Sequence, residues 1–150
     1  MKVALDLNVL LDVAQNRPQF YQDSEEVLAR ARQGEYEALI ATHLLTTFYY
    51  VMAKFSGRST ADAAVDGLLA DFTVIGADNA LLLRARALPM HDFEDNVVAA
   101  AAEASSCDYI ITRNAPDFAG SPVRAITPAD FLKLLPTPAP PASPEPPDHT

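Results

Sequence analysis

The sequence predicts an α/β protein, a three-layer α/β/α sandwich with a central parallel sheet. Short apolar runs, each suited to one buried strand, alternate along the chain with segments of helical periodicity. Strands buried on both faces have continuous apolar sequences, and their alternation with helices is typical of parallel sheets. The chain has 150 residues, of which 49% are hydrophobic, and this is enough for one domain with a sizeable core.

The N-terminal half contains two predicted strands and three predicted helices. The apolar run before Asp6 is typical of a buried strand, and Asp23 or Ser24 is suited to cap a helix that Gly34 ends. Gly57 ends an aromatic-rich helix in the same way. In chain order the elements are a strand at 3–5, a helix at 8–14, a helix ending at 32, a strand at 38–41 and a helix at 44–55.

The C-terminal half continues the alternation. Asp78, Asp92 and Thr127 stand where helices are predicted to begin, and their side chains are suited to accept hydrogen bonds from free N–H groups there. Pro128 occupies the first helical position, which proline favours. The elements are a helix from 59 or 60 to about 71, a strand at 72–75, a helix to about 88, a helix at 92–105, strands at 109–111 and 123–126, and a helix ending at 134.

Residues 1–135 are predicted to form one domain, and residues 136–150 a disordered tail. The tail is rich in proline and has no apolar periodicity, so that it has nothing with which to build a core. It is either an inert extension or a ligand for a partner that binds proline-rich segments. An interaction protein that acts through this tail is therefore one alternative function.

Charge and composition narrow the class of protein without choosing a function. No apolar run approaches the ~20 residues that span a bilayer, so we expect a cytoplasmic protein with no membrane partner. Cys107 is the only cysteine, which excludes an internal disulfide and a thiolate metal cluster. The formal net charge of -9 indicates either a solvated acidic surface or carboxylates that converge on a cation.

Acidic residues follow predicted strands at the sheet edge where parallel sheets bind ligands. Asp6 comes directly after the first strand, and residues 112–114 follow the fourth strand, with Asp117 three residues later. Asp95 lies in the first turn of the helix before the fourth strand. Carboxylates packed together repel one another, and a hard divalent cation such as Mg²⁺ or Mn²⁺ relieves this through oxygen ligands. These three carboxylates are therefore a candidate metal centre.

Each of these acids also has a purely structural interpretation. Asp92 and Asp95 are ordinary residues for a helix start, and Asp117 is suited to a turn. Asp6 is the hardest to explain in this way, since an acid that ends a buried strand costs free energy unless it is paired or coordinated. His43 is more typical of a helix start or a core than of a catalytic base. The combination of acids is stronger than any one of them.

Four segments of the chain resemble the motifs of PIN domains. The opening strand with its D-x-N-x-L-L-D pattern, a central acid before a small-residue helix, a T-R-N-x-x-D-F segment and a last strand with its helix are found at residues 5–12, 92–101, 111–118 and 126–132. They occur in the family's order and at its spacing, over about residues 1–135. The resemblance therefore implies the three-layer fold predicted above.

The resemblance also implies an activity, hydrolysis of RNA phosphodiester bonds with Mg²⁺ or Mn²⁺. Many bacterial members are ribonuclease toxins of the VapC type, which pair with an antitoxin protein, and many form homodimers. Asp6, Asp95 and Asp117 match the catalytic metal ligands of the family. Thr112 and Asn114 match residues that support the site through hydrogen bonds. Further supporting positions are Asn8, Thr47, Asp92, Arg113 and, less specifically, Asp12.

One position departs from the family pattern. Thr47 stands where members commonly carry a glutamate, so that one negative charge is missing, and Asp92 or Glu94 is suited to replace it. The alternative function is a catalytically silent PIN fold that binds RNA or a protein. Arg113 is expected either to hold a phosphate oxygen or to form a surface ion pair. Asp12 is expected either to support the site or to cap or pair on the surface.

Overall fold

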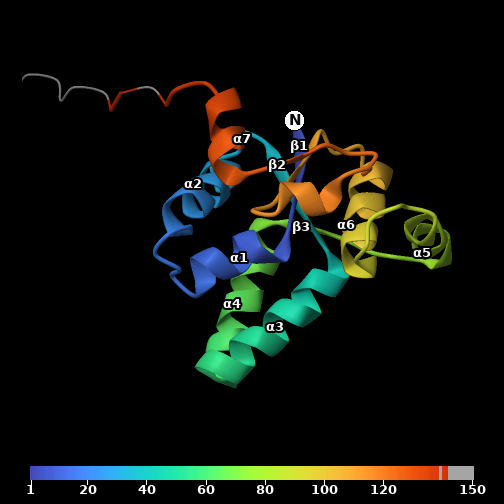
Figure 1. Ribbon diagram of the computed structural model, residues 1–150. Coiled ribbons are helices and arrows are strands. Elements are labelled where there is room, and N and C mark those ends of the chain that lie inside the picture. The colour runs from blue at the N-terminus through green and yellow to red at the C-terminus, as the bar shows by residue number, and fades with distance from the viewer. Residues whose placement is uncertain (139, 142–150) are drawn as a thin grey trace, which may run out of the picture.

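A five-stranded parallel sheet forms the centre of the computed structural model, which describes residues 1–138, 140 and 141 (Figure 1). The strand order is β3-β2-β1-β4-β5, and each neighbouring pair is parallel. The prediction of a central parallel sheet is confirmed. The strands are β1 (Lys2–Leu5), β2 (Glu37–Ala41), β3 (Thr73–Ile75), β4 (Tyr109–Ile111) and β5 (Ala125–Ile126).

Helices cover both faces of the sheet, as a three-layer fold requires (Figure 1). Helices α1, α2 and α7 lie on one side, α5 and α6 lie on the other, and α3 and α4 form a hairpin that extends from the sheet. The helices are α1 (Leu7–Ala14), α2 (Tyr21–Arg32), α3 (Thr42–Ser56), α4 (Arg58–Asp71), α5 (Asn79–Arg86), α6 (Phe93–Ala104) and α7 (Pro128–Leu134), with a short 3₁₀ helix η1 (Ala115–Phe118).

The central strand β1 determines where the chain's polar residues meet. It pairs with β2 on one side and with β4 on the other, and Leu5 lies opposite Ile111 in the register. Residues that follow β1 and β4 therefore emerge together at the carboxyl edge of the sheet, where ligands bind in this architecture. The strand itself is buried, with Val3 and Leu5 both 0% exposed.

Helix α6 is buried along most of its length. Every side chain of the segment 96–102 is buried. Four consecutive alanines within it allow α6 to pack closely against both the sheet and α5. Because the helix packs this tightly, its first turn is held firmly at the carboxyl edge of the sheet. That turn carries Asp95, so the packing of small residues determines where this acid lies.

Several predicted boundaries are wrong. Helix α2 begins at Tyr21, because the backbone N–H of Tyr21 already donates to the Arg17 carbonyl, and Asp23 and Ser24 lie within the helix instead of capping it. Helix α3 begins two residues earlier than predicted, directly after β2. The last strand is only Ala125–Ile126, and η1 was not predicted.

Helix starts and ends follow the predicted chemistry at most other positions. Asp78, Asp92 and Thr127 each accept a hydrogen bond from a backbone N–H one turn into the helix that they cap. Gly34 and Gly57 have φ angles of +82° and +87°, which favour glycine over residues with a side chain. These glycines end α2 and α3 as expected.

The predicted tail lies largely outside the described residues, which omit 139 and 142–150. Its first residue is held by the domain, since the buried Arg30 donates from Nη2 to the Pro136 carbonyl at 2.7 Å. Glu35 in turn accepts from Arg30 Nε at 2.8 Å. In the part of the chain that the structure describes, none of the helices has the length and apolar character needed to cross a bilayer.

Phe131 is the residue that fastens α7 to the sheet, and its removal tests this packing. The ring is 0% exposed and contacts Tyr36 edge-on, with centroids 5.1 Å apart. Phe131→Ala should lower the free energy of unfolding by about 3–5 kcal/mol, because a large cavity is left. Urea unfolding measures this, with Leu134→Ala on the exposed side of the same helix as the control. A loss equal to that of the control would contradict the packing described.

Candidate functional site

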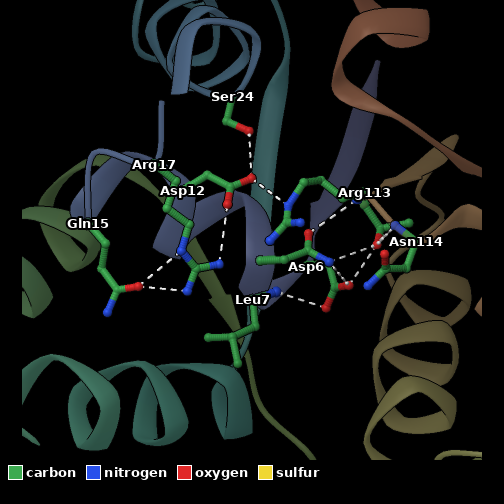
Figure 2. Close-up of polar contacts among 10 residues, drawn as sticks. Asp6, Leu7, Asp12, Gln15, Arg17, Ser24, Arg113 and Asn114 are labelled. Carbon is green, nitrogen blue, oxygen red and sulfur yellow. Dashed lines mark hydrogen bonds and ion pairs between the residues drawn. The ribbon is translucent and has the colours of Figure 1, made fainter. Parts of the chain in front are cut away.

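Asp6 is a buried acid held by its surroundings at the end of the central strand. It is 8% exposed, and its backbone N–H donates to the Ile111 carbonyl, which extends the pairing of β1 with β4. Its Oδ1 accepts from the backbone N–H of Leu7 at 2.8 Å, so that it caps α1. Its Oδ2 accepts from the Thr112 hydroxyl at 2.8 Å. The carboxylate is therefore fixed in one orientation (Figure 2).

Asn8 and Thr112 join the ends of β1 and β4. The Thr112 hydroxyl, which is fully buried, accepts from Asn8 Nδ2 at 3.3 Å and from the Asn114 backbone N–H at 3.1 Å. Asn8 Nδ2 also lies 3.3 Å from Asp6 Oδ2, and Asn8 Oδ1 accepts from the Arg113 backbone N–H at 3.2 Å. Five residues predicted for the site thus belong to one hydrogen-bonded network.

A polar pocket of about 210 Å³, called here the carboxylate pocket, opens beside Asp6. It lies between α1, the start of α3 and the start of α6. Its lining includes four acidic residues and one arginine. The lining residues are Asp6, Leu7, Asn8, Leu11, Arg17, Leu44, Asp92, Glu94 and Asp95. A larger groove of about 630 Å³ runs between α5 and α6, but its lining is mainly apolar and contains none of the predicted site residues.

The first turn of α6 supplies three of the pocket's acids. Asp92 caps the helix through a 3.0 Å hydrogen bond from the Asp95 backbone N–H, and it also lines the pocket. Asp117 lies in η1 and is exposed, and it is not part of the pocket's lining. Its negative charge nevertheless raises the pKa values of both Asp6 and Asp95, so the three acids share one electrostatic environment.

Burial and mutual repulsion make ionisation costly at this site. Burial, and then the charges of Asp6, Asp92, Asp117 and Glu94, raise the pKa of Asp95 from 3.8 to about 7. Burial also raises the pKa of Asp6, although the hydrogen bonds from Thr112 and Leu7 oppose this. A divalent cation among these oxygens would offset the repulsion, as its charge favours the ionised carboxylates.

The donor set fits a hard cation, although the side chains are not arranged as a finished coordination sphere. Within the ranges that the structure describes, no three His, Cys, Asp or Glu side chains are grouped closely enough to hold one ion as they stand. Asp6 Oδ1 accepts one hydrogen bond and keeps a lone pair, whereas Oδ2 accepts from both Thr112 and Asn8. Asp95 and Asp117 are accessible from solvent. Mg²⁺ and Mn²⁺ prefer oxygen ligands, among which carboxylates are common in proteins.

Thr47 does not take the place of the missing glutamate. It is half-buried on α3, and its hydroxyl donates to the His43 carbonyl at 3.2 Å, one helical turn back. It does not line the carboxylate pocket. Glu94, which the sequence offered as a substitute acid together with Asp92, does line it. Three of the four acids in the pocket's lining thus come from the start of α6, and the fourth is Asp6.

Asp12 and Arg113 form an ion pair beneath the surface. Asp12 is 0% exposed, and its Oδ2 lies 2.8 Å from Arg113 Nε, a contact that is an ion pair rather than a directed hydrogen bond. The surface location that was one expectation for Asp12 is wrong, because α2 packs over it and the buried Ser24 hydroxyl donates to it at 3.4 Å. The Arg113 guanidinium lies 4.0 Å from the centroid of the Phe20 ring.

Sequence reasoning missed Arg17, which lines the carboxylate pocket. The residue lies in the loop between α1 and α2, where no motif or spacing marks it. Its guanidinium is held by Gln15 and Asp12, as Figure 2 shows. Only the three-dimensional arrangement of the loop brings this cation to the acids.

His43 lies at a helix start, as the sequence predicts, but the sequence did not show that it lies beside the acids. It lies in the first turn of α3, and its Nε2 is buried and has no hydrogen-bond partner among the described residues. Burial lowers its pKa, while the charges of Glu94, Asp6 and Asp92 oppose this shift. Burial therefore favours the uncharged form of this imidazole beside the acids.

Comparison with known families matches residues 2–115 to the family model described as PIN domain. None of the curated proteins compared matches the chain. Among solved structures, the DNA-bound VapBC from Salmonella typhimurium is similar, with 18% identity, a TM-score of 0.66 and coverage of 85% of this chain and 98% of that chain.

Two further solved structures are similar to the chain. A toxin-antitoxin complex from Klebsiella pneumoniae has 21% identity, a TM-score of 0.65 and coverage of 84% of this chain and 97% of that chain. VapC20 from Mycobacterium tuberculosis, a toxin that cleaves the sarcin-ricin loop, has 12% identity, a TM-score of 0.61 and coverage of 72% and 86%. Likeness at these identities establishes the fold, and it confirms the three-layer prediction.

The raised pKa of Asp95 predicts how the stability of the cation-free protein depends on pH. The folded protein keeps the Asp95 proton up to about pH 7, whereas the unfolded chain loses it near 3.8, so stability falls as pH rises between these values. Asp95→Asn removes this cost. In EDTA it should raise Tm by about 2–4 °C at pH 8 and leave it almost unchanged at pH 4.

Thermal unfolding followed by circular dichroism measures both shifts. Asp62→Asn, at an exposed acid on α4, is the matched control and should show no pH-dependent gain. Equal shifts for Asp95→Asn at pH 4 and pH 8 would contradict the electrostatic description of the pocket.

Proposed function

Because the chain belongs to the PIN-domain family, we propose that it is a ribonuclease that uses a divalent cation to hydrolyse RNA phosphodiester bonds. The observation that carries this proposal is the placement of Asp6 and Asp95 in one pocket at the carboxyl edge of the sheet, where burial raises the pKa values of both and the charge of Asp117 adds to each shift. Ionised carboxylates placed this close together cost free energy, and a bound cation would offset that cost.

In this proposal, Asp6, Asp95 and Asp117 hold Mg²⁺ or Mn²⁺. The cation, when bound, supplies positive charge and Lewis acidity at the scissile phosphate. Asp6 is the fixed ligand, since Thr112 and the Leu7 N–H orient its carboxylate before any ion arrives. Outer groups that orient a ligand in this way strengthen metal binding.

The other predicted residues act through these ligands. Asn8 and Thr112 hold the ends of β1 and β4 together, and Asn114 begins the η1 turn that carries Asp117. Asp92 caps α6 and so positions Asp95. The supporting role expected for Thr47 is reduced to a hydrogen bond within α3.

The proposed biological role is that of the toxin in a toxin-antitoxin pair. It is supported by the family and by the likeness of the fold to those of the Salmonella VapBC and the Klebsiella toxin-antitoxin complex. An antitoxin partner, a homodimer and a cytoplasmic location belong to the same proposal. The RNA substrate is implied by the family and is supported by likeness to VapC20, a toxin that cleaves the sarcin-ricin loop.

Asp6→Asn tests the proposed activity, because it keeps the size of the side chain while it removes the charge of the fixed ligand. Cleavage of total RNA in Mn²⁺, followed on gels, should fall by more than about 100-fold, since an inner ligand matters at least as much as the groups that orient it. Circular dichroism and thermal unfolding establish that the variant is folded, and Asp62→Asn is the control. Undiminished cleavage by Asp6→Asn would contradict the proposed ribonuclease activity at this site.

The same experiment separates the ribonuclease from a catalytically silent fold. A silent module would bind RNA without cleaving it, in EDTA and in Mn²⁺ alike. If the unaltered protein cleaves RNA in Mn²⁺ and EDTA abolishes this cleavage, the ribonuclease proposal is supported. If the protein binds RNA but does not cleave it, the chain is a binding module instead.

A further inference from the structure

We infer that Arg17 binds a backbone phosphate of the RNA beside the carboxylate pocket. This makes Arg17 a substrate-binding residue of the site, and the inference rests on the proposed ribonuclease function. Arg113, which the sequence suggested as the phosphate-binding residue, instead contacts Asp12 and the Phe20 ring.

Arg17 is the one basic residue among those that line the carboxylate pocket. It shares the pocket with the acids Asp6, Asp92, Glu94 and Asp95. In the part of the chain that the structure describes, Arg17 forms no ion pair with any of these four acids. The Arg17 guanidinium therefore faces the same space as the four acids, and none of them neutralises its charge.

The side chain of Arg17 is positioned in advance. Its Nε and Nη2 donate to Gln15 Oε1 at 3.1 and 2.6 Å, and its Nη1 donates to Asp12 Oδ1 at 3.4 Å (Figure 2). Its backbone is fixed as well, because the Arg17 N–H donates to the Asp12 carbonyl and the Arg17 carbonyl accepts from two amides at the start of α2. A guanidinium has five N–H donors, and these contacts use three of them.

The charge of Arg17 is only partly compensated. Gln15, its closer partner, is neutral. Asp12, its charged partner, is 3.4 Å away and also forms the 2.8 Å ion pair with Arg113. One carboxylate thus serves two guanidinium groups, which leaves a surplus of positive charge. Since the side chain of Arg17 is 35% exposed and that of Asp12 is 0% exposed, the surplus is offered to solvent at Arg17.

Arg113 faces a different part of the surface. It lines a second pocket together with Phe20 and residues at the start of α7, and its guanidinium stacks over the Phe20 ring. It does not line the carboxylate pocket. Its contact with Asp12 instead serves to hold that carboxylate, which in turn holds Arg17.

A polyanion that enters an acidic pocket needs cationic contacts besides the metal. RNA carries a negative charge at every linkage, and four carboxylates would repel it. A guanidinium at the wall of the pocket attracts a phosphate and orients it through two parallel N–H donors. A prepared side chain also loses less conformational entropy when the RNA binds. Arg17 provides all of these features.

Salt-dependent RNA binding tests the inference directly. Affinity of a labelled single-stranded RNA for the full chain in Mg²⁺ is measured by stopped-flow anisotropy, before cleavage, over a KCl series. Arg17→Gln should weaken binding about tenfold at low salt. It should reduce the slope of log K against log salt by about 0.7, the value for one phosphate contact on a single strand.

Arg58→Gln is the matched control, since it removes the same charge at an exposed arginine on α4. Arg17→Lys, which keeps the charge, should keep the slope. If Arg17→Gln gives the affinity and slope of Arg58→Gln, the assignment of Arg17 is wrong, and normal cleavage would leave the proposed function intact. If the unaltered protein cleaves no RNA but Arg17→Gln still loses binding, the proposed function is wrong and the phosphate contact remains.

Arg17→Gln also removes a contact to the buried Asp12, so a second pair of variants is needed if it does not fold. Gln15→Ala leaves the net charge unchanged and frees the Arg17 side chain, and Gln19→Ala alters an exposed glutamine of the same loop. Gln15→Ala should weaken RNA binding about threefold with the slope unchanged, as expected for lost positioning of a charged contact. Equal affinities for Gln15→Ala and Gln19→Ala would overturn the inference.

Discussion

Repulsion between carboxylates at one edge of the sheet is the constraint that organises this molecule. Asp6 is buried at the end of the central strand, and at the start of α6 burial, followed by the neighbouring negative charges, raises the pKa of Asp95 to about 7. Such an arrangement persists only if the surrounding structure compensates for it. The hydrogen bonds from Thr112 and Leu7 to Asp6, and the buried alanines that hold α6 against the sheet, provide that compensation in the absence of a cation.

A second electrostatic arrangement balances the first. Asp12, on α1 six residues after Asp6, is fully buried and forms ion pairs with two arginines. A buried acid between two cations stabilises the loop after α1 only while both partners remain, since removal of one partner of a buried pair is costly. The loop therefore has a fixed conformation, and that conformation presents Arg17 to the carboxylate pocket. The acids of the carboxylate pocket and the Arg17 guanidinium thus line the same small pocket.

Local chemistry predicted the fold and most of the candidate site, and tertiary packing accounts for the rest. Asp6 was predictable because an acid directly after a buried strand costs free energy unless it is paired or coordinated, and Thr112 because it follows the neighbouring strand. Arg17 was not, because its position depends on a pairing with Asp12 that exists only once α2 packs over α1. The early start of α2 has the same origin, since the Arg17 carbonyl accepts from Tyr21 and begins the helix before any capping side chain.

The central claim is that the carboxylate pocket binds one divalent cation through Asp95, and isothermal titration with Mn²⁺ tests it most directly. Titrations at pH 6.5 in two buffers with different ionisation enthalpies give the number of sites and the protons released. We expect one saturable site per chain and the release of up to about one proton, because Asp95 must lose its proton to bind metal. Asp95→Asn should abolish both signals. No saturable heat, or an unchanged titration in Asp95→Asn, would contradict the account.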